Sequence, residues 1–373
     1  MSVLRPGQRG PDVAALRRAL AELGLLRNTG ADVDVYDSPT EHAVRGFQQR
    51  RGLSVDGRVG PDTAAALQAA HWQLGARVLA HNATAPLVGD DVTALQNQLI
   101  ELGYRAGRPD GVFGTSTAEA LRSFQRESGL LPDAVCGPVT LRALKQLGRR
   151  VVGGRPQLLR DMMAVAQSGP SLLGKRIVID PGHGGGDTGQ RAGWVAEADL
   201  TWDLATRLEG RLSAIGVTSW LTRGPASGPT EAERAAFAND VAADVVISLH
   251  VDRNDSPRPE GLATFHYGTL GGSGTSSSIG ERLAELVQRE VVARTGLVDL
   301  HSHPKSWDLL RLTRMPAVRV EVGYLSHDAD RERLLQPSFR DHVAEGILVA
   351  VQRLYLPRDA DPETGVLRMP AAS

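Results

Sequence analysis

The chain has 373 residues, and this length predicts two or three domains rather than one compact unit. Apolar residues make up 41% and charged residues 23% of the sequence, a globular balance that excludes wholesale disorder. The net charge of −1 shows no basic excess, so we expect no nucleic-acid partner. Cys136 is the only cysteine, which excludes an internal disulfide framework and a Cys-rich zinc site.

The sequence shows no segment typical of export or membrane insertion. Its first ten residues contain no apolar stretch of signal-peptide length, and no run of about 18 apolar residues occurs anywhere. We therefore expect no transmembrane segment and a cytoplasmic location. A cell-wall or extracellular location is expected instead if the N-terminus is processed or if export is non-standard.

The first part of the chain contains an internal repeat. Five positions between Val13 and Gly24 recur after a shift of 79 residues, and nine positions between Phe47 and Leu67 recur after a shift of 77. The first copy therefore has two additional residues, near Asn28–Tyr36. Fourteen matching positions with one small insertion indicate a duplication.

Each copy is predicted to form three short helices. In the first helix of the first copy, apolar residues at spacings of three and four indicate one buried face that ends at Gly24: Val13, Leu16, Leu20 and Leu23. Pro61 and Pro138 each follow a glycine and are placed to open the third helix. We predict two all-α three-helix modules, at residues 5–72 and 85–147.

The sequence pattern changes after the second copy. Residues 148–174 are predicted to be a linker, and residues 357–373, rich in Pro, Asp and Gly, a flexible tail. Between them, apolar runs alternate with helical segments, which predicts an α/β domain at 175–356 with a mostly parallel sheet. The expected strands are 176–180, 218–222, 244–250, 262–267 and 317–322, and the expected helices are 198–215, 230–241, 279–295 and 339–355.

Four ionisable residues of this domain form a candidate metal site. His183 follows the first strand in a Gly-rich turn, Glu197 begins a helix, and His250 ends the strand of residues 244–250. Two imidazoles and one carboxylate can hold zinc with one coordination position open. Glu321 interrupts an apolar strand, where a buried carboxylate requires a partner or a catalytic role.

The same Gly-rich turn allows a second interpretation. Residues Gly184–Gly189 fit the G-x-G-x-x-G pattern of dinucleotide-binding sites. That site requires a helix to begin within the glycines, whereas here the helix is predicted to begin only near Glu197. Glu209, about 20 positions on, falls inside the helix rather than at a strand end. The pattern therefore favours the metal site.

Three further histidines are weaker candidates. His301 and His303 flank Ser302 and could contact a metal, but their polar surroundings predict a solvated loop. His266 lies within an alternating strand and is predicted to be structural.

Residues 175–356 resemble the zinc-dependent N-acetylmuramoyl-L-alanine amidases of the amidase-3 type. The matching stretches include Ile177–Gly185, Ala243–His250 and Val320–Tyr324. The resemblance implies that His183, Glu197 and His250 bind zinc and that Glu321 acts in catalysis. It also implies hydrolysis of the amide between N-acetylmuramic acid and the L-alanine of the stem peptide, with peptidoglycan or a muropeptide precursor as the partner. The N-terminal copies resemble three-helix peptidoglycan-binding repeats, the second one most closely through Pro109–Gly114.

The order of the whole chain, over residues 5–356, resembles the actinobacterial CwlM-type proteins. These include cytoplasmic, amidase-like regulators of peptidoglycan precursor synthesis, some of which lack the metal ligands. A second hypothesis is therefore a regulator that binds precursors or precursor-synthesis proteins. Asp252 and His327 stand where asparagine is common in the amidases, and they could alter how substrate fits. Because His183, Glu197 and His250 are all present, we favour the hydrolase.

Overall fold

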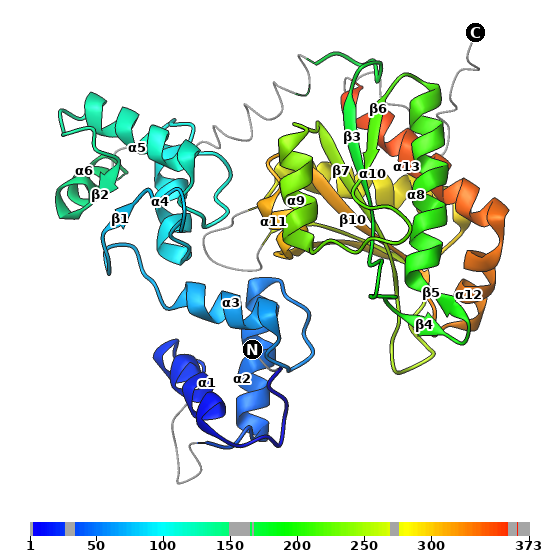
Figure 1. The fold of residues 1–373 in the computed structure, drawn as a ribbon, viewed down its shortest axis with the longest axis horizontal. Coiled ribbons are helices and arrows are strands. Elements are labelled where there is room, and N and C mark those ends of the chain that lie inside the picture. The colour runs from blue at the N-terminus through cyan, green and yellow to red at the C-terminus, as the bar shows by residue number, and fades with distance from the viewer. Residues whose placement is uncertain are drawn as a thin grey trace. The chain divides into compact units, whose positions relative to one another are not determined.

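The computed structural model describes residues 3–26, 34–148, 165, 168–268, 276–356 and 364. They form two compact units, of which one holds the N-terminal helices and the other the C-terminal sheet (Figure 1). Most of the predicted linker 148–174, most of the predicted tail 357–373 and part of the predicted insertion near Asn28–Tyr36 lie outside the described residues. In the described part, no helix has the length and apolar character needed to cross a bilayer.

The N-terminal unit contains the two predicted three-helix modules. The helices of the first are α1 (Pro11–Glu22), α2 (Ser38–Arg51) and α3 (Pro61–Ala70), and those of the second are α4 (Asp90–Glu101), α5 (Thr115–Glu127) and α6 (Pro138–Gly148). Of the predicted apolar face, Val13, Leu16 and Leu20 are buried and Leu23 is half-buried, and Gly24 follows with a φ of 70°. A short strand before the predicted second module also packs on it, since β1 (Leu79–Ala80) pairs with β2 (Val135–Cys136) and Leu79 is fully buried.

One polar network occurs three times in these modules. Gln125 donates through Nε2 to Asp133 Oδ1 at 2.8 Å and to Thr140 Oγ1 at 3.2 Å, and its Oε1 accepts from Ala134 N at 2.9 Å. The same contacts join two other sets, Gln48 with Asp56 and Thr63, and Gln96 with Asp110 and Thr117. A buried amide needs such partners. The network thus explains the recurrence of Gln, Asp and Thr by folding rather than by ligand binding.

The C-terminal unit is built on a six-stranded sheet of order β6-β3-β7-β10-β8-β9. Its strands are β3 (Arg176–Pro181), β6 (Thr218–Leu221), β7 (Val245–Asp252), β8 (Leu262–Tyr267), β9 (Asp299–Lys305) and β10 (Ala317–Tyr324). Neighbouring strands are parallel except for β10 and β8. The predicted α/β class with a mostly parallel sheet is confirmed.

Helices cover both faces of this sheet (Figure 1). One face carries α8 (Glu197–Ala214), α10 (Ser278–Thr295) and α13 (Pro337–Tyr355), and the other carries α9 (Glu231–Asp240) and α11 (Asp308–Leu312). Alternate residues of β3 divide between the two layers, since Ile177 and Ile179 join the first core and Val178 the second. The hairpin of β4 (Arg191–Ala192) and β5 (Val195–Ala196), β9, α11 and α12 (Asp328–Leu335) had not been predicted.

Candidate metal centre

His183 lies in the turn that follows β3, and its ring is held by a carboxylate from the same turn. The residue has a φ of 59°, which is uncommon for a side chain larger than glycine. Its Nδ1 lies 2.7 Å from Asp187 Oδ2, and its Nε2 lies 3.2 Å from Glu197 Oε2. A carboxylate on one ring nitrogen fixes the orientation of a metal-binding imidazole and leaves the other nitrogen for the metal. Asp187 had not been singled out in the sequence.

Glu197 is the first residue of α8, and its carboxylate lies between the two histidines. One oxygen is 3.2 Å from His183 Nε2 and the other is 2.9 Å from His250 Nδ1. Backbone N–H groups of Gln190 and Val251 also donate to this carboxylate, at 2.9 and 3.1 Å. Burial by itself raises the pKa of Glu197, but the hydrogen bonds and charges of the two histidines outweigh it and lower the pKa. Glu197 is therefore an anionic ligand candidate.

His250 and Glu321 come from adjacent parallel strands, β7 and β10, and their Cα atoms are partners in the register. Neither residue ends its strand, because β7 continues to Asp252 and β10 to Tyr324. The prediction that His250 closes a strand is therefore wrong by two residues. Burial and the charge of Arg319 lower the pKa of His250 to about 4, despite Glu197. Its imidazole is therefore neutral at neutral pH, with a lone pair available to a metal.

Two glycines leave the space that these side chains occupy. A Cβ on Gly182 would overlap the imidazole of His250. A Cβ on Gly189, where φ is +64°, would lie 2.6 Å from Glu197 Oε2 and 2.7 Å from His183 Cδ2. The glycines around His183 thus allow the side chains of His183, Glu197 and His250 to approach one another closely.

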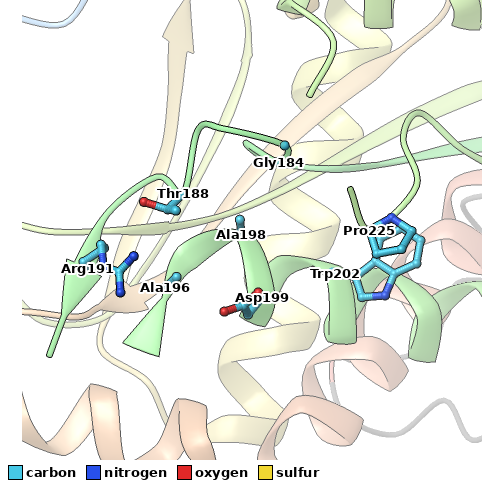
Figure 2. Close-up of a pocket in the computed structure, with 9 residues that line it drawn as sticks. Gly184, Thr188, Arg191, Ala196, Ala198, Asp199, Trp202 and Pro225 are labelled. Atoms are coloured by element: carbon cyan, nitrogen blue, oxygen red, sulfur yellow. The ribbon is translucent and has the colours of Figure 1, made fainter. Parts of the chain in front are cut away.

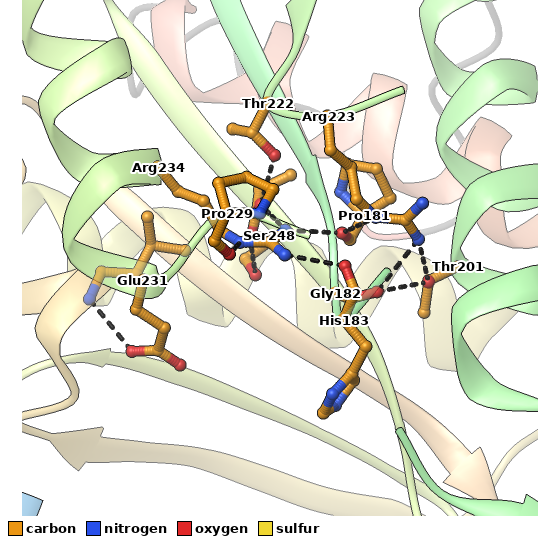
Figure 3. A network of polar contacts seen from close by, with 12 residues as sticks. Pro181, Gly182, His183, Thr201, Thr222, Arg223, Pro229, Glu231, Arg234 and Ser248 are labelled. Carbon is orange, nitrogen blue, oxygen red and sulfur yellow. Dashed lines mark hydrogen bonds and ion pairs between the residues drawn. The ribbon is translucent and has the colours of Figure 1, made fainter. Parts of the chain in front are cut away.

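A buried ion pair anchors the turn that carries His183 (Figure 3). Arg234 Nη1 lies 2.7 Å from Asp180 Oδ1, and Arg234 Nη2 donates to the carbonyl of His183 at 2.7 Å. Burial raises the pKa of Asp180, but the charge of Arg234 and hydrogen bonds from Ser248 and Thr222 outweigh this and hold the pKa below its usual value. With these contacts Arg234 anchors the turn.

A second arginine closes the other side of the same turn. Arg223 donates from Nε to Pro181 O at 2.8 Å, and from Nη2 to Gly182 O at 3.1 Å and Ala198 O at 2.9 Å. Because Ala198 follows Glu197, this one guanidinium ties the start of α8 to the end of β3. Figure 3 shows both arginines around these backbone carbonyls.

Glu321 is buried and interacts with Arg319, which stands two residues before it on β10. Nε of Arg319 donates to Oε1 of Glu321 at 2.8 Å, and Nη2 of Arg319 lies 2.7 Å from the same oxygen. Burial and the charges of Glu197 and Asp252 raise the pKa of Glu321, Arg319 lowers it, and the net result is a pKa of about 7. This value suits a group that takes up and gives back a proton near neutral pH. Residues two positions apart on a strand lie on the same face of the sheet. This spacing could have identified Arg319 from the sequence as a neighbour of Glu321.

The three residues His183, Glu197 and His250 fit a divalent metal. Each offers one ligand atom, and these atoms all lie within 4.8 Å of one another. Two imidazole nitrogens and one carboxylate oxygen are the donors of many catalytic zinc sites. Glu260, His327 and Asp330 also lie close enough together to hold an ion, but Glu260 is exposed. The first group lies beside Glu321, a buried carboxylate with a raised pKa.

A polar pocket of about 160 Å³ lies next to the turn and the start of α8 (Figure 2). It is lined by Gly184, Gly185, Thr188, Arg191, Ala196, Ala198, Asp199, Trp202 and Pro225. The glycines do not open a helix, since Gly184 and Asp187 form a tight reciprocal turn and the hairpin of β4 and β5 precedes α8. This geometry agrees with the rejection of a dinucleotide site.

The weaker histidine candidates lie in or beside the far edge of the sheet. His301 and His303 belong to β9, so the prediction of a loop is wrong, although both are exposed as expected. This edge strand is mostly polar and contains no apolar run that would have predicted it. His266 is buried in β8 and its Nδ1 lies 3.2 Å from Ser302 Oγ, as expected of a structural residue.

Comparisons with known proteins identify the family. Residues 177–353 match the N-acetylmuramoyl-L-alanine amidase family (Amidase_3), and residues 9–67 and 88–144 match the peptidoglycan binding domain family (PG_binding_1). The chain is 50% identical to N-acetylmuramoyl-L-alanine amidase CwlM of Mycobacterium tuberculosis, over 97% of this chain and 92% of that protein. It is 30% identical to N-acetylmuramoyl-L-alanine amidase LytC of Bacillus subtilis, over 47% of this chain and 34% of that protein.

A crystal structure of N-acetylmuramoyl-L-alanine amidase from Clostridium difficile 630 matches 48% of this chain and 95% of that chain, with 26% identity and a TM-score of 0.45. The match to CwlM runs along nearly the whole of both proteins and includes the repeats as well as the sheet domain. The chain belongs to the N-acetylmuramoyl-L-alanine amidase family, in the CwlM-type order of two peptidoglycan-binding repeats followed by an amidase domain.

Proposed function

We propose that this chain is a zinc-dependent amidase that hydrolyses the bond between N-acetylmuramic acid and L-alanine in peptidoglycan or its precursors. The observation that carries the proposal is the convergence of His183, Glu197 and His250 beside Glu321 on the neighbouring strand. The donor set suits zinc, and the family match indicates the amide that is cleaved. The repeats would bring the domain to its polymer or precursor.

His183, Glu197 and His250 would hold the ion. Zinc in such a site polarises a carbonyl and makes water a better nucleophile at neutral pH. Asp187 keeps the ring of His183 oriented, and the ion pair of Asp180 with Arg234 fixes the backbone from which that ring projects. These contacts preorganise the ligands, so that little rearrangement is needed when the ion binds.

Glu321 supplies the proton transfers. Its carboxylate takes one proton from the attacking water as the water oxygen bonds to the carbonyl carbon. It then gives that proton to the alanine nitrogen as the carbon–nitrogen bond breaks. The products are a free muramic acid carboxyl group and a peptide with an N-terminal L-alanine. The raised pKa of Glu321 supports both roles, because a group near neutrality can be base and then acid.

A muropeptide digestion tests the proposal. The zinc-loaded protein is expected to release peptides with N-terminal L-alanine, and Glu321→Ala is expected to reduce the rate by about 10²- to 10⁴-fold, the usual contribution of a general acid–base. Glu285→Ala, at an exposed position of α10, is the matched control and should retain full activity. Absence of product from the zinc-loaded wild type would contradict the proposal and favour the regulator of precursor synthesis.

A further inference from the structure

Arg319 is the charged group in closest contact with Glu321. Both of its contacts, from Nε at 2.8 Å and Nη2 at 2.7 Å, go to the same oxygen, Glu321 Oε1. A guanidinium presents its donors in a rigid plane, so two contacts restrict the carboxylate more than one flexible contact does. Because Oε1 is held by two contacts, the position of the second oxygen of Glu321, Oε2, is fixed as well.

Arg319 is itself held from two further sides. Its Nη1 lies 3.2 Å from Oε1 of Glu231, the first residue of α9, whose Oε2 accepts from the backbone N–H of Leu309 at 3.2 Å. The ring of Trp307 lies against the guanidinium, with 4.4 Å between its centroid and Cζ. A cation over an indole ring is attracted by it. The guanidinium is thus fixed by α9, by the segment before α11 and by its own strand.

We propose that Arg319 is a positioning residue of the amidase reaction, which holds Glu321 by Oε1 and presents Oε2 to the reacting water. This inference rests on the proposed function. It also gives Glu231 and Trp307 the role of anchoring the guanidinium. A base that is misplaced by about 1 Å can lose about 10²-fold in rate, so the fixation of one oxygen has a measurable consequence.

A merely structural ion pair would behave differently. It would stabilise the fold, and its loss would lower stability without separating kcat from KM. An inhibitory ion pair that occupies the base Glu321 would also differ from a positioning residue, because its removal would raise activity. Arg319 as a positioning residue predicts a loss in kcat with KM almost unchanged, since the guanidinium contacts the base rather than the substrate.

The test compares Arg319→Met and Arg319→Lys with the wild-type full-length protein, all loaded with zinc. Met keeps an unbranched stem that reaches as far as Nε of arginine but carries no charge, and Lys keeps the charge without the planar fork. We expect kcat to fall about 10²-fold in Arg319→Met, with KM within about twofold, and to recover in part in Arg319→Lys. Arg211→Met is the matched control, because Arg211 pairs with Asp341 away from the site.

A second variant and a second readout guard against simple unfolding. Glu231→Gln removes one anchor of Arg319 and leaves Arg319 and Glu321 in place, and we expect a smaller fall in kcat without a change in zinc affinity. The thermal midpoints of the metal-free Arg319→Met, Glu321→Gln and double variants measure the coupling of the pair directly, and we expect the two losses to be non-additive. These midpoints do not depend on activity.

The outcomes separate this inference from the proposed function. If the wild type releases no peptide, the proposed function fails, whatever the midpoints show. If the wild type is active and Arg319→Met keeps its kcat or gains activity, the positioning role is wrong. Additive midpoints would likewise overturn it, because Arg319 and Glu321 would then not be coupled.

Discussion

Glu321 lies opposite His250 in the parallel pairing of β10 with β7. This one register places the candidate base beside a candidate ligand without any contribution from a loop. Sites built on strands are held more precisely than sites built on loops. His183 and Glu197, by contrast, come from a turn and a helix start, and they depend on Asp187, Arg223 and Arg234 for their placement.

Removing Asp187 should weaken metal binding while the fold remains intact. In Asp187→Asn the carboxylate that holds His183 Nδ1 is lost, and such changes typically reduce metal affinity by about 10- to 100-fold. Competition with a zinc chelator measures the affinity. Asp240→Asn, at an exposed position that ends α9, should bind zinc as the wild type does. Equal affinities of Asp187→Asn and the wild type would show that Asp187 does not orient the ligand.

A single methyl group at Gly182 should disrupt the site. In Gly182→Ala the new Cβ would overlap the ring of His250, so the imidazole or the backbone must move and zinc affinity should fall. Gly186→Ala is the matched control in the same turn, because its Cβ would meet no atom within 4 Å and its φ lies outside the left-handed region. Titration with zinc distinguishes the two variants. Unchanged affinity in Gly182→Ala would mean that His250 is not a ligand.

The ion pair of Asp180 with Arg234 should be important for stability. Asp180→Asn leaves a guanidinium buried without its counter-charge, and breaking a buried pair in this way typically costs about 3–5 kcal/mol. Urea unfolding of the full chain measures the loss. Asp240→Asn again serves as the exposed control. A loss below about 1 kcal/mol, the range of surface pairs, would contradict the assignment.

The carboxylate of Asp180 makes the free energy of unfolding depend on pH. The pKa of Asp180 is lower in the folded state than in the unfolded state, so its contribution is complete above the unfolded value of about 4. That contribution is lost as the pH falls through the folded pKa, because the folded carboxylate must then be protonated. The free energy of unfolding should therefore decline below about pH 4, and Asp180→Asn should decline less steeply. Parallel curves would exclude Asp180 as a source of the decline.

The repeated polar network should matter for the second module. Gln125→Leu removes the amide that binds Asp133 and Thr140, and the buried backbone N–H of Ala134 loses the oxygen that accepts its hydrogen bond. Such an orphaned group costs about 1–3 kcal/mol. Gln146→Leu, exposed on α6, is the control. Unfolding followed by a probe of the helical unit should show destabilisation only in Gln125→Leu, and equal effects would contradict the structural role.

Apolar runs and their periodicity predicted the strands and helices of the central layers. β8 was predicted to the residue, because Leu262–Tyr267 alternates and is bounded by turn residues. β9 was missed, because Asp299–Lys305 is a polar edge strand with no apolar run. α12 was missed for a similar reason, since Asp328–Leu335 is short and mostly charged. A buried element has an apolar pattern that predicts it from the sequence. Elements at the periphery bury few side chains and therefore show little of this pattern.

The candidate site was predicted in its main residues but not in their supports. His183, Glu197, His250 and Glu321 come together, as the spacing of strands and helix starts indicated. Asp187 sits among small residues of a turn, where one acidic side chain carries no distinctive signal. Its role depends on the conformation of the turn, and no local pattern specifies that conformation.

The most direct test of the account is the dependence of peptide release on zinc. The purified protein is stripped with a chelator and titrated with zinc, and peptides with N-terminal L-alanine are measured at each step. We predict that activity is lost on stripping and rises linearly until it saturates near one zinc per chain, while His250→Ala neither binds this zinc nor regains activity. Activity that survives stripping, or a zinc-loaded protein that releases no peptide, would contradict the account.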